Sequence, residues 1–111
     1  MARILVVEDD ATQLEFRKQI LELAGHEIVC AQDVCQALER WEGSSVVVMD
    51  LRIPEQEDGL RLIRAIAGQA RIIVLSGAEA DPALPVDEFL TKPCPTKRLL
   101  AAIEKWKSSV R

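Results

Sequence analysis

Long hydrophobic runs are missing from this sequence of 111 residues. Apolar stretches such as residues 4–7 and 46–49 are four residues long, whereas a helix that crosses a bilayer needs roughly 20 apolar residues. The N-terminus also lacks the apolar segment and cleavage site of a signal peptide, because a strand-like run begins at residue 4. These absences predict a cytoplasmic protein with no membrane partner.

The sequence also lacks paired cysteine motifs, a second histidine and an excess of positive charge. Cys30, Cys35 and Cys94 show neither CxxC spacing nor nearby histidines, so we expect reduced thiols and no zinc site. The single histidine, His26, follows Gly25 in a predicted turn, which favours a surface position over a role in phosphate transfer or metal binding. Lysine and arginine number 14 against 18 aspartates and glutamates, and this net charge of −4 argues against nucleic-acid binding through bulk charge.

The residues that are present have the composition of a small globular domain. Apolar residues make up 49% of the chain and charged residues 29%, a balance that supports a packed core. No internal repeat, linker or second compositional regime divides the sequence. We therefore expect residues 1–111 to form a single domain.

Strand and helix patterns alternate along the chain. Short apolar, β-branched runs predict strands at residues 4–7, 27–31, 46–50, 71–75 and 86–91. Helical spacing of apolar residues predicts helices at 12–24, from 34 to the Gly43 region, at 59–67 and at 96–110. This alternation predicts an α/β fold with an open parallel sheet, right-handed crossovers and helices on both faces.

The apolar residues of the predicted helices suggest which faces are buried. In the first helix, Phe16, Ile20, Leu23 and Ala24 have the spacing of one helix face, which predicts that this face packs on the sheet. Trp41 and Trp106 lie on apolar faces of later helices and are expected in the core.

Polar side chains of complementary kinds follow four of the predicted strands. Glu8 and Asp9 follow the first strand, Asp50 ends the third, Ser76 follows the fourth and Lys92 the fifth. The ends of parallel strands meet at one edge of the sheet, where three carboxylates would repel one another unless a cation neutralised them. Mg²⁺ suits such oxygen ligands, and a lysine with a serine can bind a phosphoryl group. Asp10 is instead expected to start the first helix.

These motifs resemble the response-regulator receiver domain of two-component signalling, over essentially the whole chain. The resemblance rests on ILVVEDD at residues 4–10, VVVMDLRIP at 46–54, IIVLSG at 72–77 and FLTKP at 89–93. It implies a flavodoxin-like, doubly wound, five-stranded parallel sheet with strand order 2-1-3-4-5.

The resemblance also implies a role for each matching residue. Asp50 corresponds to the phosphoacceptor, and Glu8, Asp9, Asp50 and the backbone carbonyl of Arg52 to the Mg²⁺ ligands. Ser76 and Lys92 correspond to the residues that bind the phosphoryl group, while Ser76 and Phe89 correspond to the switch positions. Phenylalanine has no hydroxyl, so switching at residue 89 should work through packing.

The implied function is phosphoryl transfer from a histidine kinase, a phosphotransfer protein or a small phosphodonor to Asp50. We also expect the domain to catalyse its own phosphotransfer and dephosphorylation weakly. It should act on an output partner that the sequence does not identify, without direct contact with nucleic acid. The alternative is a receiver-like interaction module that works without phosphorylation. A flavin or nucleotide binder lacks support because GxGxxG is absent. A haloacid-dehalogenase-like phosphatase would need a DxD pair, whereas Arg52 stands two residues after Asp50.

The segment between Ser76 and Phe89 departs from the family pattern. It has only twelve residues, and Pro82 and Pro85 oppose helix formation there. We therefore predict that the fourth helix of the family is shortened or absent and that residues 78–85 are mobile. The thinner cover should leave apolar surface open for a homodimer or another partner.

Overall fold

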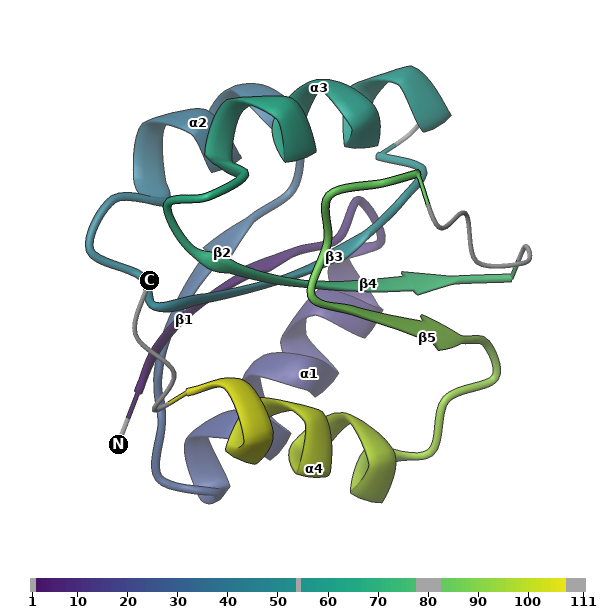
Figure 1. Cartoon of the computed structure of the whole chain (residues 1–111). Coiled ribbons are helices and arrows are strands. Elements are labelled where there is room, and N and C mark those ends of the chain that lie inside the picture. Colours follow the sequence, from purple (N-terminus) through teal and green to yellow (C-terminus); the bar gives the residue numbers. More distant parts are fainter. Residues whose placement is uncertain (1, 54, 78–82, 108–111) are drawn as a thin grey trace.

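The computed structural model describes residues 2–53, 55–77 and 83–107. Five strands form one sheet with helices on both of its faces (Figure 1). The strands are β1 Arg3–Val7, β2 Glu27–Ala31, β3 Val46–Asp50, β4 Arg71–Ser76 and β5 Glu88–Thr91. The helices are α1 Ala11–Leu23, α2 Val34–Arg40, α3 Gln56–Ile66 and α4 Thr96–Trp106. None of these helices is long and apolar enough to cross a membrane.

The sheet has the order β2-β1-β3-β4-β5, and all of its strand pairs are parallel. The α/β fold class and strand order predicted above are therefore confirmed. Asp50 lies opposite Leu75, and Ser76 lies opposite Thr91, so β3, β4 and β5 end at the same edge. The largest boundary differences are in two helices: α3 begins at Gln56, three residues before the predicted start, and α4 ends at Trp106, four residues before the predicted end.

Two apolar cores lie on opposite faces of the sheet. Helices α2 and α3 cover one face, and α1 and α4 cover the other (Figure 1). Side chains alternate along each strand, so Leu5 and Val7 enter the core under α2 and α3, while Ile4 and Val6 enter the other core. All four are fully buried, which explains why these strands have continuous apolar sequences.

The predicted buried face of α1 is wrong. Phe16 is 61% exposed, Leu23 is 88% exposed and Ala24 is also exposed, whereas Ile20 is half-buried. The buried apolar residues of this helix are Leu14 and Leu21. Between them on the same stripe lies Arg17, three residues after Leu14 and four before Leu21, with its side chain only 12% exposed. Because Arg17 is charged, the buried face of α1 is not continuously apolar, and the spacing of apolar residues therefore indicated the wrong face.

This correction predicts a large difference between two leucines of α1. Leu21→Ala should lower the free energy of unfolding by about 2–5 kcal/mol, because it leaves a cavity in the core. Leu23→Ala is the matched control, and it should change the same free energy by less than about 0.5 kcal/mol because Leu23 is exposed. Urea unfolding of the two variants measures both values. Equal destabilisation would show that the assignment of the buried face is incorrect.

No helix occurs between β4 and β5 among the described residues, as predicted for the fourth helix of the family. Leu84 and Val86 pack, partly buried, against the core under α2 and α3. The expected open apolar surface is therefore not found in the described part of this segment. Residues 78–82, with Pro82, lie outside the described residues, so the predicted mobility of 78–85 stays a prediction.

Asp87 binds the chain just before β5 to the neighbouring strand β4. Its carboxylate accepts hydrogen bonds from the guanidinium of Arg71 at 2.9 Å and from the backbone N–H of Ile72 at 2.8 Å. Its own backbone N–H donates to the carbonyl of Ile72 at 2.9 Å. These contacts hold the chain at the edge of β4 just before β5 begins.

The predicted surface position of His26 is also wrong. Its side chain is buried, and Nδ1 accepts a hydrogen bond from the backbone N–H of Ala2 at 3.2 Å. Burial lowers the pKa of His26 below its ordinary value of 6.5, and the charge of Lys107 acts in the same direction while Glu104 opposes it. The folded protein therefore favours the neutral imidazole, which can accept this bond.

Acid should destabilise the fold through His26. Because the pKa is lower in the folded state, a fall in pH below about 6.5 protonates the unfolded chain first and reduces the free energy of unfolding. The loss stops below the folded pKa, and its slope is at most about 1.4 kcal/mol per pH unit. His26→Gln keeps an acceptor but does not titrate, so its stability should vary less between pH 7.5 and 5.5 in urea unfolding. Parallel pH profiles for the two proteins would contradict this assignment.

Candidate functional site

A pocket of about 400 Å³ lies at the ends of β3, β4 and β5. Its lining consists of Asp50, Leu51, Arg52, Leu75, Ser76, Gly77 and Lys92. The structure therefore brings Asp50, Ser76 and Lys92 together, as the strand ends predict, and Arg52, which the family resemblance added, also lines the pocket. The parallel register explains this convergence, since Asp50 and Ser76 end neighbouring strands and Lys92 directly follows β5.

Asp50 is the central acidic group of this pocket. Its carboxylate is buried, and Lys92 Nζ lies 2.8 Å from its Oδ1. Burial raises the pKa of Asp50 above its ordinary range, while the hydrogen bond and charge of Lys92 oppose the rise. The Lys92 side chain is 39% exposed, so it can contact both Asp50 and a ligand in the pocket. The backbone N–H of Lys92 donates to the carbonyl of Ser76 at 2.7 Å and ties these two pocket residues together.

The three acidic residues after β1 have different environments. Glu8 is buried, and its Oε1 accepts a hydrogen bond from the backbone N–H of Asp10 at 3.0 Å. Asp9 is exposed. Asp10 caps the start of α1, as expected, because its Oδ1 accepts hydrogen bonds from the backbone N–H groups of Thr12 at 2.9 Å and Gln13 at 3.1 Å.

The described residues contain no group of three or more histidine, cysteine, aspartate or glutamate side chains placed to hold one metal ion. The expected meeting of Glu8, Asp9 and Asp50 is therefore incomplete in this structure. Glu8 and Asp50 are instead brought together by a shared partner, the guanidinium of Arg17.

Arg17 is the site residue that the sequence analysis missed. Its Nη1 donates to Glu8 Oε2 at 2.8 Å and to Asp50 Oδ2 at 3.3 Å. Burial lowers the pKa of Arg17 below its ordinary value, but arginine remains charged in proteins. The sequence did contain one signal for a buried Arg17, because Leu14, Arg17 and Leu21 have the spacing of one helix face. That spacing indicates a buried arginine only when a buried carboxylate partner is already known.

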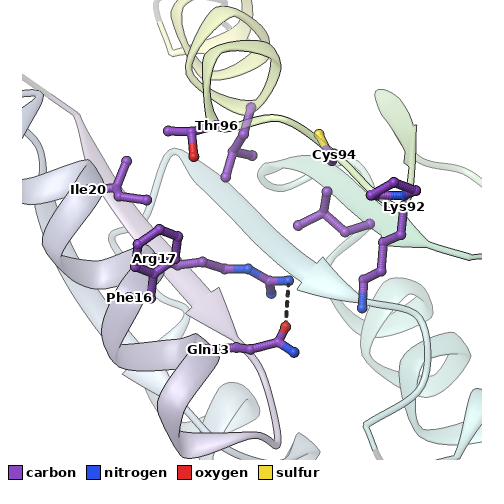
Figure 2. A pocket seen from close by; sticks show the side chains of 10 residues that line it. Gln13, Phe16, Arg17, Ile20, Lys92, Cys94 and Thr96 are labelled. Carbon is purple, nitrogen blue, oxygen red and sulfur yellow. Dashed lines mark hydrogen bonds between the residues drawn. The ribbon is translucent and has the colours of Figure 1, made fainter.

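A second cavity, of about 580 Å³, adjoins this site between α1 and the start of α4 (Figure 2). Its lining includes Phe16, Ile20, Pro93, Cys94, Thr96 and Leu99. Arg17 and Lys92 also line it, so both side chains connect this groove with Asp50. Figure 2 shows Arg17 extending from α1 toward Gln13, whose Oε1 accepts a hydrogen bond from Nη2 at 3.5 Å. The groove places exposed apolar surface beside the acidic site.

The two predicted switch residues occupy neighbouring strands. Ser76 ends β4, and Phe89 lies on β5 opposite Val74. Phe89 is partly buried against the core under α2 and α3. A change in its packing would therefore alter the core on that face of the sheet. The switching role itself stays a prediction.

Comparison with known proteins places this geometry in a family. Residues 4–104 match the response regulator receiver domain. The transcriptional regulatory protein CpxR of Escherichia coli strain K12 is 30% identical over 112 residues, which cover 93% of this chain and 48% of CpxR. The chain thus spans about half the length of this curated relative.

Solved structures agree with the family match. The non-phosphorylated HemR receiver domain of Leptospira biflexa is 28% identical, with a TM-score of 0.87, and the match covers 100% of this chain and 98% of that one. The response regulator protein TrrA of Thermotoga maritima, in complex with Mg²⁺ and BeF, is 28% identical, with a TM-score of 0.84 and coverage of 96% and 99%. With the fold, the strand-end site and these matches in agreement, the chain belongs to the family of response regulator receiver domains.

Proposed function

We propose that this domain accepts a phosphoryl group on Asp50 from a histidine kinase or a phosphotransfer protein and then acts on an output partner. The observation that carries the proposal is the buried Asp50 carboxylate, 2.8 Å from Lys92 Nζ in a pocket that Ser76 also lines. The three free thiols, Cys30, Cys35 and Cys94, suit the reducing cytoplasm, where we expect the domain to work.

The chemistry that we assign to this site is an in-line displacement. A carboxylate oxygen of Asp50 forms a bond to the phosphorus of the donor, while the bond from phosphorus to the donor breaks and its electron pair leaves with the donor. The Lys92 ammonium balances negative charge on the transferring oxygens, and the Ser76 hydroxyl can donate a hydrogen bond to one of them. Attack by water on the aspartyl phosphate would return the domain to its starting state.

The acidic residues fit Mg²⁺ as a cofactor. Glu8 and Asp50 are two buried carboxylates that already contact one positive group, and Asp9 adjoins Glu8 in the chain. Carboxylate and carbonyl oxygens are hard ligands, so Glu8, Asp9, Asp50 and the backbone carbonyl of Arg52 would hold the ion. When bound, Mg²⁺ would neutralise charge on the phosphoryl oxygens.

We expect the histidine-bearing partner to dock on the groove between α1 and α4. Phe16 is 61% exposed at its rim, and Pro93 and Leu99 add apolar lining. Because Lys92 lines both the groove and the phosphoacceptor pocket, a partner bound there would lie beside Asp50.

Mg²⁺ binding should depend on Asp9 more than on Asp10. Asp9→Ala should weaken the affinity for Mg²⁺ about tenfold or more, as expected when a carboxylate close to a divalent ion is removed. Asp10→Ala should leave the affinity nearly unchanged but lower the free energy of unfolding by about 0.5–2 kcal/mol, because it removes the cap of α1. Calorimetric titration with MgCl₂ and urea unfolding in EDTA measure the two effects. A larger loss of Mg²⁺ affinity in Asp10→Ala would reverse the assignment.

The proposed function is tested directly by incubation with MgCl₂ and acetyl phosphate, followed by intact mass measurement. The expected result is a gain of one phosphoryl group. A protein that gains no mass under conditions that label another receiver domain would contradict the proposal. That outcome would favour the second candidate, an interaction module that works without phosphorylation, for which the contact of Arg17 with Asp50 at 3.3 Å is the supporting observation.

A further inference from the structure

The guanidinium of Arg17 contacts both buried carboxylates of the acidic site. It lies 2.8 Å from Glu8 and 3.3 Å from Asp50, measured from Nη1 to a carboxylate oxygen of each, and Nη2 lies 3.5 Å from the other oxygen of Asp50. The side chains of Glu8 and Asp50 are only 4% and 5% exposed. Two carboxylates this deeply buried need neutralising charge. Arg17 supplies it to both of them, and Lys92 adds a second positive charge at Asp50, 2.8 Å from Oδ1.

A Mg²⁺ ion at this site would require the same oxygens. A carboxylate oxygen that ligates a metal at short range has less negative charge to offer a guanidinium, and two positive groups on the same pair of carboxylates repel each other. The Arg17 contacts and a metal held by Glu8 and Asp50 therefore exclude or weaken each other.

We propose that Arg17 is an internal counter-ion that competes with Mg²⁺ for Glu8 and Asp50 and thereby sets the affinity of this domain for the metal. The inference rests on the proposed function, in which Mg²⁺ binds at these carboxylates. Displacement of the guanidinium does not require α1 to unfold, because Arg17 also lines the groove of about 580 Å³ between α1 and α4. Gln13, one helical turn earlier, already accepts a hydrogen bond from Nη2.

The test compares Mg²⁺ affinity in wild type, Arg17→Met and Arg17→Gln by calorimetric titration with MgCl₂ after treatment with EDTA. Both variants should bind Mg²⁺ about tenfold more tightly than wild type, because the competing charge is gone. Arg17→Gln keeps a polar side chain at the site and provides a second folded protein if Arg17→Met is unstable. Lys18→Met is the matched control, since it removes one positive charge from the same helix at a residue outside the site, and its affinity should equal that of wild type.

Urea unfolding supplies a readout that is independent of phosphorylation. In EDTA, Arg17→Met should unfold at a lower urea concentration than wild type, and MgCl₂ should raise its midpoint by more than it raises that of wild type. Equal or weaker Mg²⁺ binding by both Arg17 variants would overturn the inference and leave the proposed function standing. If neither the wild type nor the variants bind Mg²⁺, the proposed metal site is wrong and the inference falls with it.

Discussion

Asp50→Asn is expected to abolish the gain of one phosphoryl group when the protein is incubated with MgCl₂ and acetyl phosphate. An amide has no negative oxygen with which to attack phosphorus, and Asp50 is the carboxylate in the pocket that Lys92 and Ser76 also line. The substitution nearly preserves the size of the side chain, so lost labelling reports the chemistry and not a change in packing. Intact mass measured over time quantifies the effect.

Asp58→Asn is the control for this experiment. Asp58 lies in the first turn of α3, where its Oδ2 accepts a hydrogen bond from the backbone N–H of Glu55 at 3.1 Å, and an amide oxygen can accept the same bond. This variant should be labelled at the wild-type rate. Labelling of Asp50→Asn at that rate would mean that another residue accepts the phosphoryl group.

Gly59→Ala is expected to be severely destabilising. A Cβ atom at this position would lie 1.8 Å from the carbonyl oxygen and 2.7 Å from the carbonyl carbon of Leu51, and backbone atoms cannot turn away as a side chain can. Either α3 or the loop after Asp50 must move. We expect a cost at or above the upper end of the roughly 1–3 kcal/mol that overpacking usually causes.

The same substitution should impair phosphorylation. Leu51 and Arg52 line the pocket that contains Asp50, and the backbone N–H of Leu51 donates to the carbonyl of Leu75 at 3.4 Å, so movement of this loop alters the pocket. Gly77→Ala is the control for stability, because a Cβ at Gly77 meets no atom within 4 Å. Urea unfolding should separate the two variants clearly. Equal unfolding midpoints would refute the close approach of α3 to Leu51.

The parallel sheet and the meeting of polar residues at its edge could be anticipated from sequence because their signals are local, whereas the strand order was anticipated only from the resemblance to the family. Residues 4–7 and 46–49 are continuous apolar runs, which suit strands buried on both faces. A polar residue follows each run. Parallel pairing brings these positions to one edge of the sheet, and this does not depend on the conformation of the connecting loops. Asp50, Ser76 and Lys92 therefore meet as expected.

The orientation of α1, the burial of His26 and the place of Arg17 depended on contacts between residues distant in the chain. His26 bonds with Ala2, 24 residues away, and Arg17 pairs with Asp50, 33 residues away. Helical periodicity assigns apolar residues to the core and charged residues to solvent, so it placed Phe16 and Leu23 inside. A buried arginine is favourable only where carboxylates are also buried, and the assembled sheet creates that condition by placing Glu8 and Asp50 under α1.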